Sequence, residues 1–133
     1  MNPHYLAVAR RAGHRCEYCR APEALFNLPF EVDHVVPTAR DGSNEESNMA
    51  LTCRSCNLHK TDRVQAVDKV TGESVPLFDP RTHRWSEHFV VDQDRAEIVG
   101  LTPTGRATVE QLRLNDPSQI VARQLWIALR LFP

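Results

Sequence analysis

The sequence predicts an α+β fold organised around a β-hairpin and the helix that follows it. Three observations lead to this prediction: an apolar run at 30–36, a second short apolar run at 49–52, and two Cys-x-x-Cys motifs, at 16–19 and 53–56, that enclose them. Short apolar runs bounded by turn residues are typical of β-strands. The chain after Cys53 suits a helix, so the local order is strand, long loop, strand, helix.

The boundaries of the N-terminal elements have their own signals. A short helix is predicted at 5–12, between Pro3 and Gly13, because Pro suits the first turn of a helix and Gly its end. Pro37 ends the first strand, and the polar loop after it contains turn-forming Asp, Gly and Asn residues. The helix after the second strand is expected to cover about 54–67.

The C-terminal half is predicted to be a further α+β unit. Its expected elements are strands at 85–91 and 96–101, a helix capped by Thr104 and running to about 114, and a terminal helix that starts at Asp116-Pro117. We therefore divide the chain into a metal-bound core at 1–67 and a C-terminal extension at 68–133. The extension is expected to pack on the core or to form an interface.

The four cysteines predict a structural zinc site. Cys16 and Cys19 form one pair and Cys53 and Cys56 the other, with no spare thiol, which suits a tetrahedral ion held by four thiolates. Such a site contributes on the order of 10 kcal/mol to the folding of a small domain. Two disulfides or a redox-active pair are the alternatives, and the expected cytoplasmic location disfavours the disulfides.

Composition and charge exclude some classes of protein. The 133 residues carry a net charge of −1, with 41% hydrophobic and 25% charged residues. No apolar run approaches the roughly 18–20 residues that span a bilayer, and the N-terminus has no signal-peptide pattern. We therefore expect a cytoplasmic protein without a membrane partner. Because the chain is not strongly basic, any contact with DNA must come from local Arg and Lys residues.

Asp33 and His34 are the first candidates for chemistry. Side chains of adjacent strand residues diverge, so one can hold a cation while the other handles a proton nearby. Asn57, at the start of the following helix, offers a hard oxygen that suits Mg²⁺ or Mn²⁺ together with Asp33. His34 could accept a proton from an attacking water, and Asn48 could clamp the loop and fix His34.

This arrangement resembles the HNH endonucleases of the ββα-metal nuclease group. The resemblance covers residues 14 to about 63 and rests on Cys16-x-x-Cys19, Asp33-His34-Val35-Val36-Pro37, Asn48-Met49, and Cys53-Arg54-Ser55-Cys56-Asn57 with Lys60. It implies a zinc-stapled ββα-metal core and metal-dependent DNA cleavage by a single ion. By this resemblance His34 is the general base, Asp33 and Asn57 ligate the ion, and Asn48 orients the loop.

Lys60, Arg63 and Arg15 are the candidate contacts with nucleic acid. Lys60 lies three residues after Asn57 and shares its face of the helix. A solvated charged surface is the alternative for Arg63 and for the basic N-terminal edge. His59 lies about 200° round the helix from Asn57, which argues against it as a ligand. Were the ion soft, such as Zn²⁺ or Ni²⁺, His34 and His59 could bind it directly.

Two functions are open on the sequence alone. The first is an HNH endonuclease that hydrolyses DNA, and the second is a non-catalytic, zinc-stabilised module that binds DNA or protein. A small RNase is a further alternative, because the site would act on the phosphodiester group, which DNA and RNA share, and not on the sugar. The expected partners are DNA, a second copy of the chain through the apolar face of the last helix, and a protein that supplies specificity. Residues 80–89 and 100–109 also resemble the tail of small free-standing HNH proteins of bacteria and phages.

Overall fold

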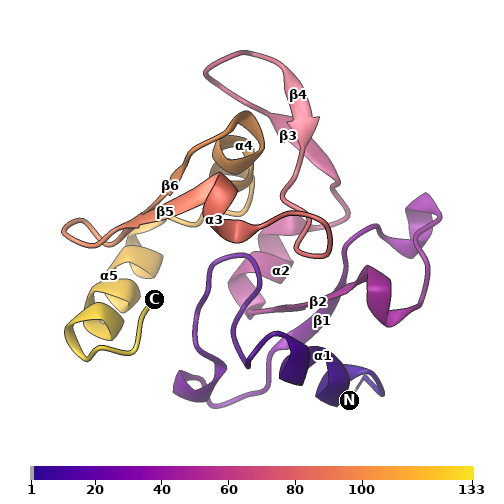
Figure 1. Ribbon diagram of the computed structural model, residues 1–133, viewed down its shortest axis with the longest axis horizontal. Coiled ribbons are helices and arrows are strands. Elements are labelled where there is room, and N and C mark those ends of the chain that lie inside the picture. The colour runs from indigo at the N-terminus through magenta and orange to yellow at the C-terminus, as the bar shows by residue number, and fades with distance from the viewer. Residues whose placement is uncertain (1) are drawn as a thin grey trace.

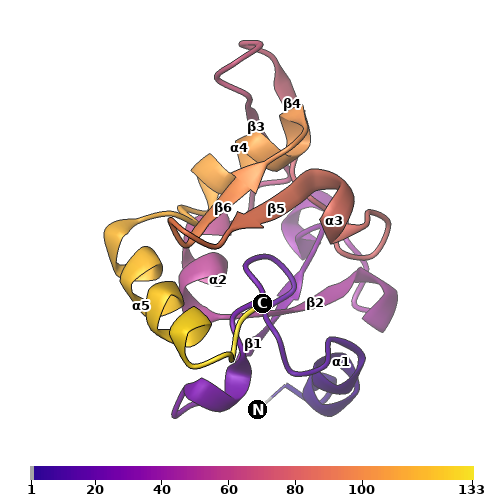
Figure 2. The ribbon, with the colours of Figure 1, turned by 60° about the vertical axis from the view of Figure 1, so that its left-hand side comes forward.

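The computed structural model describes residues 2–133 as a set of helices and small antiparallel strand pairs, which confirms the predicted α+β class. The helices are α1 (Tyr5–Arg11), α2 (Arg54–Lys60), α3 (Trp85–His88), α4 (Pro103–Gln111) and α5 (Pro117–Ala128). The strands are β1 (Glu31–His34), β2 (Met49–Thr52), β3 (Gln65–Val67), β4 (Ser74–Pro76), β5 (Phe89–Asp92) and β6 (Glu97–Gly100). Helix α2 lies between the β1–β2 hairpin and the C-terminal elements (Figures 1 and 2).

Strands β1 and β2 form the predicted hairpin. They pair antiparallel, with Glu31 opposite Thr52 and His34 opposite Met49. Every residue of β2 is buried, which explains its apolar sequence. The loop that joins the two strands is largely exposed and contains two short 3₁₀ turns. The hairpin therefore carries the end of β1 to the surface while β2 anchors it in the core.

Helix α2 is shorter than the sequence predicts. It ends at Lys60, and Thr61 has a φ of 55°, which is outside the helical region. The predicted continuation to about residue 67 is wrong, because residues 65–67 form β3 and pair antiparallel with β4. Gly72 turns the chain between these strands at a φ of 76°, which glycine adopts without strain. This second hairpin projects from the body in Figure 1 and is absent from the sequence prediction.

The strand predicted at 85–91 is wrong in its first half. Residues 85–88 form the single turn α3, and the extended segment starts at Phe89, where β5 pairs with β6 as expected. Trp85 gives the physical reason. Its Nε1 donates a hydrogen bond to the carbonyl oxygen of Tyr18 at 2.8 Å, and its ring lies 5.0 Å from that of Phe89, centroid to centroid. The contact with Tyr18 is tertiary, so the local sequence does not show it.

Helices α4 and α5 start near their predicted positions. Thr102, rather than Thr104, caps α4, because its Oγ1 accepts the N–H of Gly105 at 3.0 Å. Helix α5 begins at Pro117, as predicted. Gly105 lets α4 approach α3 closely, since a Cβ there would lie 2.1 Å from the carbonyl oxygen of His88.

One hydrophobic core joins the two halves of the chain. Tyr18 belongs to the same buried cluster as Phe78 and Phe89. The rings of Tyr18 and Phe78 meet edge to face with their centroids 6.4 Å apart. Arg81 pairs with Glu17 across the same boundary. The division into two domains stays a prediction, but the two stretches share a core.

The last helix packs on the N-terminal half through Trp126. The Trp126 ring lies 5.9 Å from the Phe26 ring and 6.2 Å from the Phe132 ring. Part of the apolar face of α5 is exposed, with Val121 at 58% and Leu125 at 60% of their full accessible area. The predicted homodimer stays a prediction. Among the described residues, no helix combines the length and the apolar character needed to cross a membrane.

Candidate active site

The four cysteines come together at one point. Their sulfur atoms all lie within 4.8 Å of one another, and the Sγ atoms of Cys19 and Cys53 are 3.7 Å apart. A tetrahedron with zinc–sulfur bonds of about 2.3 Å has sulfur–sulfur edges of roughly 3.8 Å. All four thiols are free and buried, so the structure does not support the disulfide alternative. The cluster suits a structural zinc ion.

The chemistry of this donor set also fits a cation. Hydrogen bonding to the Cys16 sulfur, together with burial, raises the pKa of Cys19 and Cys56 well above the usual value. Several thiolates can be ionised in such a buried site only if a cation balances their charge. Cys53 also caps α2, because its Sγ accepts the N–H of Cys56 at 3.4 Å. The cysteine cluster therefore fixes the start of the helix that carries Asn57.

The first Cys-x-x-Cys turn is tied to both halves of the molecule. One carboxylate oxygen of Glu17 accepts the N–H of Leu51 in β2 at 2.8 Å, and the other pairs with Arg81. The carbonyl oxygen of Tyr18 accepts the Nε1–H of Trp85. Residues from β2 and from the C-terminal half thus hold this turn in place.

Asp33 is buried on the side of β1 that meets α2. Its Oδ2 accepts a hydrogen bond from the Tyr18 hydroxyl at 3.1 Å and lies 3.1 Å from Lys60 Nζ. Burial raises the pKa of Asp33 above its usual value, although the charge of Lys60 and the two hydrogen bonds favour the ionised form. Its Oδ1 accepts no hydrogen bond from residues 2–133, so one carboxylate oxygen stays available as a ligand.

Asn57 reaches from the first turns of α2 towards β1. Its Nδ2 donates to the carboxylate of Glu31, and only the amide nitrogen can do so. Within the described chain its Oδ1 accepts no hydrogen bond. Asp33 and Asn57 thus each have one polar atom held by a neighbour and one oxygen free, which fits a hard divalent ion. The ring of His59 lies elsewhere on α2, with its Nδ1 3.4 Å from Ser55 Oγ.

His34 engages the loop on the other side of β1. Its Nε2 lies 2.9 Å from Asn44 Oδ1. An amide oxygen only accepts hydrogen bonds, so Nε2 carries a proton, and in the neutral ring Nδ1 is then the nitrogen with the lone pair. No group among residues 2–133 donates to Nδ1, and the residue is half-buried. The ring is therefore oriented with one nitrogen able to take a proton.

Asn48 holds the loop closed beside His34. Its Oδ1 accepts the N–H of Val36 at 3.0 Å, and its Nδ2 donates to the carbonyl oxygens of Val36 at 2.9 Å and Ser43 at 2.8 Å. These bonds bring the far end of the loop back to the residues that follow β1. The His34 ring itself is held by Asn44, which the same loop carries.

Lys60 has an internal position. It is 1% exposed, and its Nζ lies 3.1 Å from the carbonyl oxygen of Val35 and 3.3 Å from that of His34. With Asp33 these acceptors match the three N–H donors of an ammonium group. This arrangement does not favour the predicted phosphate contact. It makes Lys60 a brace between the end of α2 and the end of β1.

The other two predicted nucleic-acid contacts differ from each other. Arg15 donates to the carbonyl oxygens of Arg20 at 3.0 Å and Leu131 at 3.3 Å, so its guanidinium is engaged within the protein. Arg63 is exposed and makes no ion pair with the part of the chain that the structure describes. Of the three predicted contacts, Arg63 is the one that is free to meet an outside phosphate.

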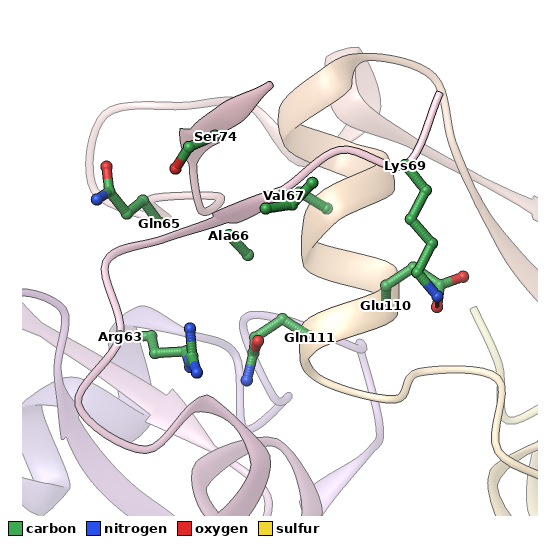
Figure 3. A pocket seen from close by; sticks show the side chains of 9 residues that line it. Arg63, Gln65, Ala66, Val67, Lys69, Ser74, Glu110 and Gln111 are labelled. Carbon is green, nitrogen blue, oxygen red and sulfur yellow. Dashed lines mark hydrogen bonds and ion pairs between the residues drawn. The ribbon is translucent and has the colours of Figure 1, made fainter. Parts of the chain in front are cut away.

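Arg63 also lines a groove between the β3–β4 hairpin and α4, with a volume of about 420 Å³ (Figure 3). Arg63 and Gln111 both line the groove, and Lys69 pairs with Glu110 at 3.1 Å within it. A second hollow, of about 240 Å³, is lined by Arg63 and by Val35 at the end of β1. Arg63 therefore stands between the end of β1 and the groove.

Sequence reasoning missed three residues of this site. Glu31 had a usable signal, because it lies two residues before Asp33 and so shares a face of the strand. Asn44 and Tyr18 had none, because 10 and 15 residues separate them from the side chains they contact. Only the folded chain pairs them with their partners.

Comparison with known families identifies the segment that carries these residues. A family model described as HNH endonuclease matches residues 16–63. The match includes all four cysteines, the β1–β2 hairpin and α2, and it indicates a nuclease-type function. Neither the curated proteins nor the solved structures give a match. Residues 16–63, which contain the four-cysteine cluster suited to zinc, thus match the model of the HNH endonuclease family.

Proposed function

We propose that this chain is a metal-dependent endonuclease that hydrolyses phosphodiester bonds of DNA. The observation that carries the proposal is the state of His34. Asn44 holds its Nε2, which leaves Nδ1 as a proton acceptor on a half-buried ring. The neighbouring residue, Asp33, keeps one carboxylate oxygen free. A base next to a metal ligand is the pair that hydrolysis by an activated water needs.

The proposed mechanism gives each side chain one task. Asp33 and Asn57 would hold Mg²⁺ or Mn²⁺ through their free oxygens, and the ion, when bound, would offset charge on the phosphate and on the leaving oxygen. His34 accepts the proton of the attacking water at Nδ1, while Asn44 keeps the ring in place. The water oxygen bonds to phosphorus, the bond from phosphorus to the 3′ oxygen breaks, and the 3′ oxygen takes a proton from solvent, giving 5′-phosphate and 3′-hydroxyl ends. Asn48 keeps the loop closed throughout.

We propose that residues 1–67 supply the chemistry and that 68–133 extend the DNA-binding surface. Arg63 is exposed and lines both the hollow at the end of β1 and the groove of Figure 3. A guanidinium suits phosphate oxygens, because it offers several N–H donors in a fixed plane. A DNA strand bound at the end of β1 could therefore continue into the groove past Arg63.

The test is cleavage of supercoiled plasmid by the purified, zinc-loaded protein, with Mg²⁺, with Mn²⁺ and with EDTA. His34→Ala should lower the cleavage rate by about a hundredfold or more, because it removes the general base. His59→Ala is the matched control, since it removes a histidine from the adjacent helix and should leave the rate nearly unchanged. Zinc content and the melting temperature are measured on all three proteins.

Three results would change the proposal. Full activity of His34→Ala would remove His34 as the base. Cleavage of RNA but not of DNA would point to the RNase alternative. Binding of DNA without cleavage, by a folded wild type with either ion, would favour a non-catalytic module.

A further inference from the structure

Tyr18 lies in the turn from Cys16 to Cys19, the zinc turn, and contacts Asp33, the proposed ion ligand, directly. Its side chain is fully buried, and its hydroxyl donates to Oδ2 of Asp33 at 3.1 Å. The two residues come from different elements, since Tyr18 lies between Cys16 and Cys19 and Asp33 lies in β1. No other acceptor for this hydroxyl exists among residues 2–133.

The position of Tyr18 is fixed from three sides. Two zinc-binding cysteines flank it in the sequence, and Trp85 donates to its carbonyl oxygen at 2.8 Å. Its ring packs edge to face on Phe78. A phenol hydroxyl that faces a carboxylate oxygen is the hydrogen-bond donor, so Tyr18 donates to Asp33.

The hydrogen bond acts on the orientation of the Asp33 carboxylate. Tyr18 and Lys60 both approach Oδ2, and they come from the zinc turn and from α2 respectively. With Oδ2 held by two donors, the carboxylate plane is fixed and Oδ1 is the oxygen left free. Mutation of a residue that hydrogen-bonds to a metal ligand typically lowers metal affinity 10–100-fold.

We infer that Tyr18 is a positioning residue for the catalytic divalent ion, and that it couples the structural zinc turn to the ion site through Asp33. This inference rests on the proposed function in one respect, the assignment of Asp33 as a ligand. Tyr18 touches neither the substrate nor the ion. It acts by holding the carboxylate that does.

The test is Mn²⁺ binding to zinc-loaded protein, measured by electron paramagnetic resonance without DNA. Tyr18→Phe keeps the ring and removes only the hydroxyl. Tyr5→Phe is the matched control, because the Tyr5 hydroxyl donates to a different carboxylate, that of Glu23, at 2.7 Å. Asp33→Asn marks complete loss of the site. Tyr18→Phe should weaken Mn²⁺ binding about tenfold or more, with zinc content and melting temperature close to those of Tyr5→Phe.

Plasmid cleavage against Mn²⁺ concentration gives the second readout. In Tyr18→Phe the half-saturating Mn²⁺ concentration should rise by a similar factor, while the rate at saturating Mn²⁺ changes less. Three results would overturn the inference. They are wild-type Mn²⁺ affinity in Tyr18→Phe, an equal loss of Mn²⁺ affinity in both tyrosine variants, and no Mn²⁺ binding by the wild type. Mn²⁺ binding that depends on Asp33 and Tyr18, without any cleavage, would overturn the proposed function and leave the inference standing.

Discussion

The two halves of this molecule share one hydrophobic core but differ in what else their elements contribute to it. In the HNH segment, residues 16–63, the strands have four residues each and α2 has seven, and four cysteine sulfurs lie within 4.8 Å of one another. In the C-terminal half, α4 covers the β5–β6 hairpin (Figure 1), and the core is made of apolar side chains that include Phe78, Phe89, Ile98, Leu112 and Leu114. The HNH segment therefore adds a cysteine cluster suited to zinc to the apolar core that the two halves share, whereas the C-terminal half contributes apolar packing.

The two buried cations show the same difference. Lys60 and Arg123 are both 1% exposed. Lys60 pairs with the carboxylate of Asp33 at 3.1 Å. The guanidinium of Arg123 donates to neutral oxygens, those of Ala96 at 2.8 Å and Leu114 at 2.7 Å, and burial lowers its pKa. Each cation braces its own half, but only Lys60 does so through a proposed functional residue.

Loss of zinc should produce the largest difference in local stability between the two halves. Cys53→Ser removes a proposed zinc ligand and the cap of α2. It should therefore lower the free energy of unfolding by several kcal/mol, up to the order of 10 kcal/mol for complete zinc loss. Hydrogen exchange should show that the amide of Leu51 in β2 loses protection first, while the amides of β5 and β6 keep part of theirs. Simultaneous loss in both halves would show that they unfold as one cooperative unit. Wild type treated with EDTA is the comparison sample.

A pair of glycine substitutions should separate stability from activity. In Gly105→Ala the new Cβ would lie 2.1 Å from the carbonyl oxygen of His88. We expect a loss of about 3 kcal/mol and a fall in Tm of roughly 10 °C, because α4 can no longer approach α3. In Gly42→Ala the Cβ would lie 1.7 Å from the carbonyl oxygen of Val36, in the exposed loop that carries Asn44.

Gly42→Ala should therefore shift the loop and release the His34 ring, with a smaller fall in Tm than Gly105→Ala. Plasmid cleavage should fall about tenfold in Gly42→Ala when both variants are assayed well below their melting temperatures. The opposite pattern, with Gly42→Ala the less stable and fully active, would contradict the contrast between the two halves.

The β3–β4 hairpin should show a smaller, pH-dependent effect. The guanidinium of Arg106 holds Asp68 through two hydrogen bonds, of 3.0 and 2.9 Å, and keeps its pKa well below the usual range. A depressed carboxyl pKa stabilises the fold above the unfolded value of about 4, and this stabilisation is lost as pH falls through the lower, folded value. Asp68→Asn should thus lower Tm at neutral pH, and the difference from wild type should shrink below about pH 4.

The control for this prediction is Lys69→Ala on the same hairpin. Lys69 pairs with Glu110 at 3.1 Å, but both side chains are more than half exposed. Exposed pairs contribute less than about 1 kcal/mol, so Tm should stay nearly unchanged. A difference between Asp68→Asn and wild type that grows with acidity would contradict the assigned role of Arg106.

Much of the fold near the site could be predicted, because its signals are local. The β1–β2 hairpin follows from two apolar runs, and the cysteine cluster follows from two fixed spacings. The end of α2 at Lys60 could not be predicted, because residues 65–67 pair with a strand nine residues further along. Trp85 likewise starts a helical turn where the local pattern suits a strand, because its indole is bound to Tyr18.

The sequence by itself determined which residues are available for chemistry: four thiols, an Asp-His pair on a strand, and Asn48 and Asn57 at set distances from it. The tertiary structure decided what each of them contacts. It placed Asn44 on the His34 ring, Tyr18 on the Asp33 carboxylate and Lys60 inside the protein. The physical reason is that residue type and spacing fix chemical capacity and local conformation, whereas orientation and burial depend on contacts between segments distant in the chain.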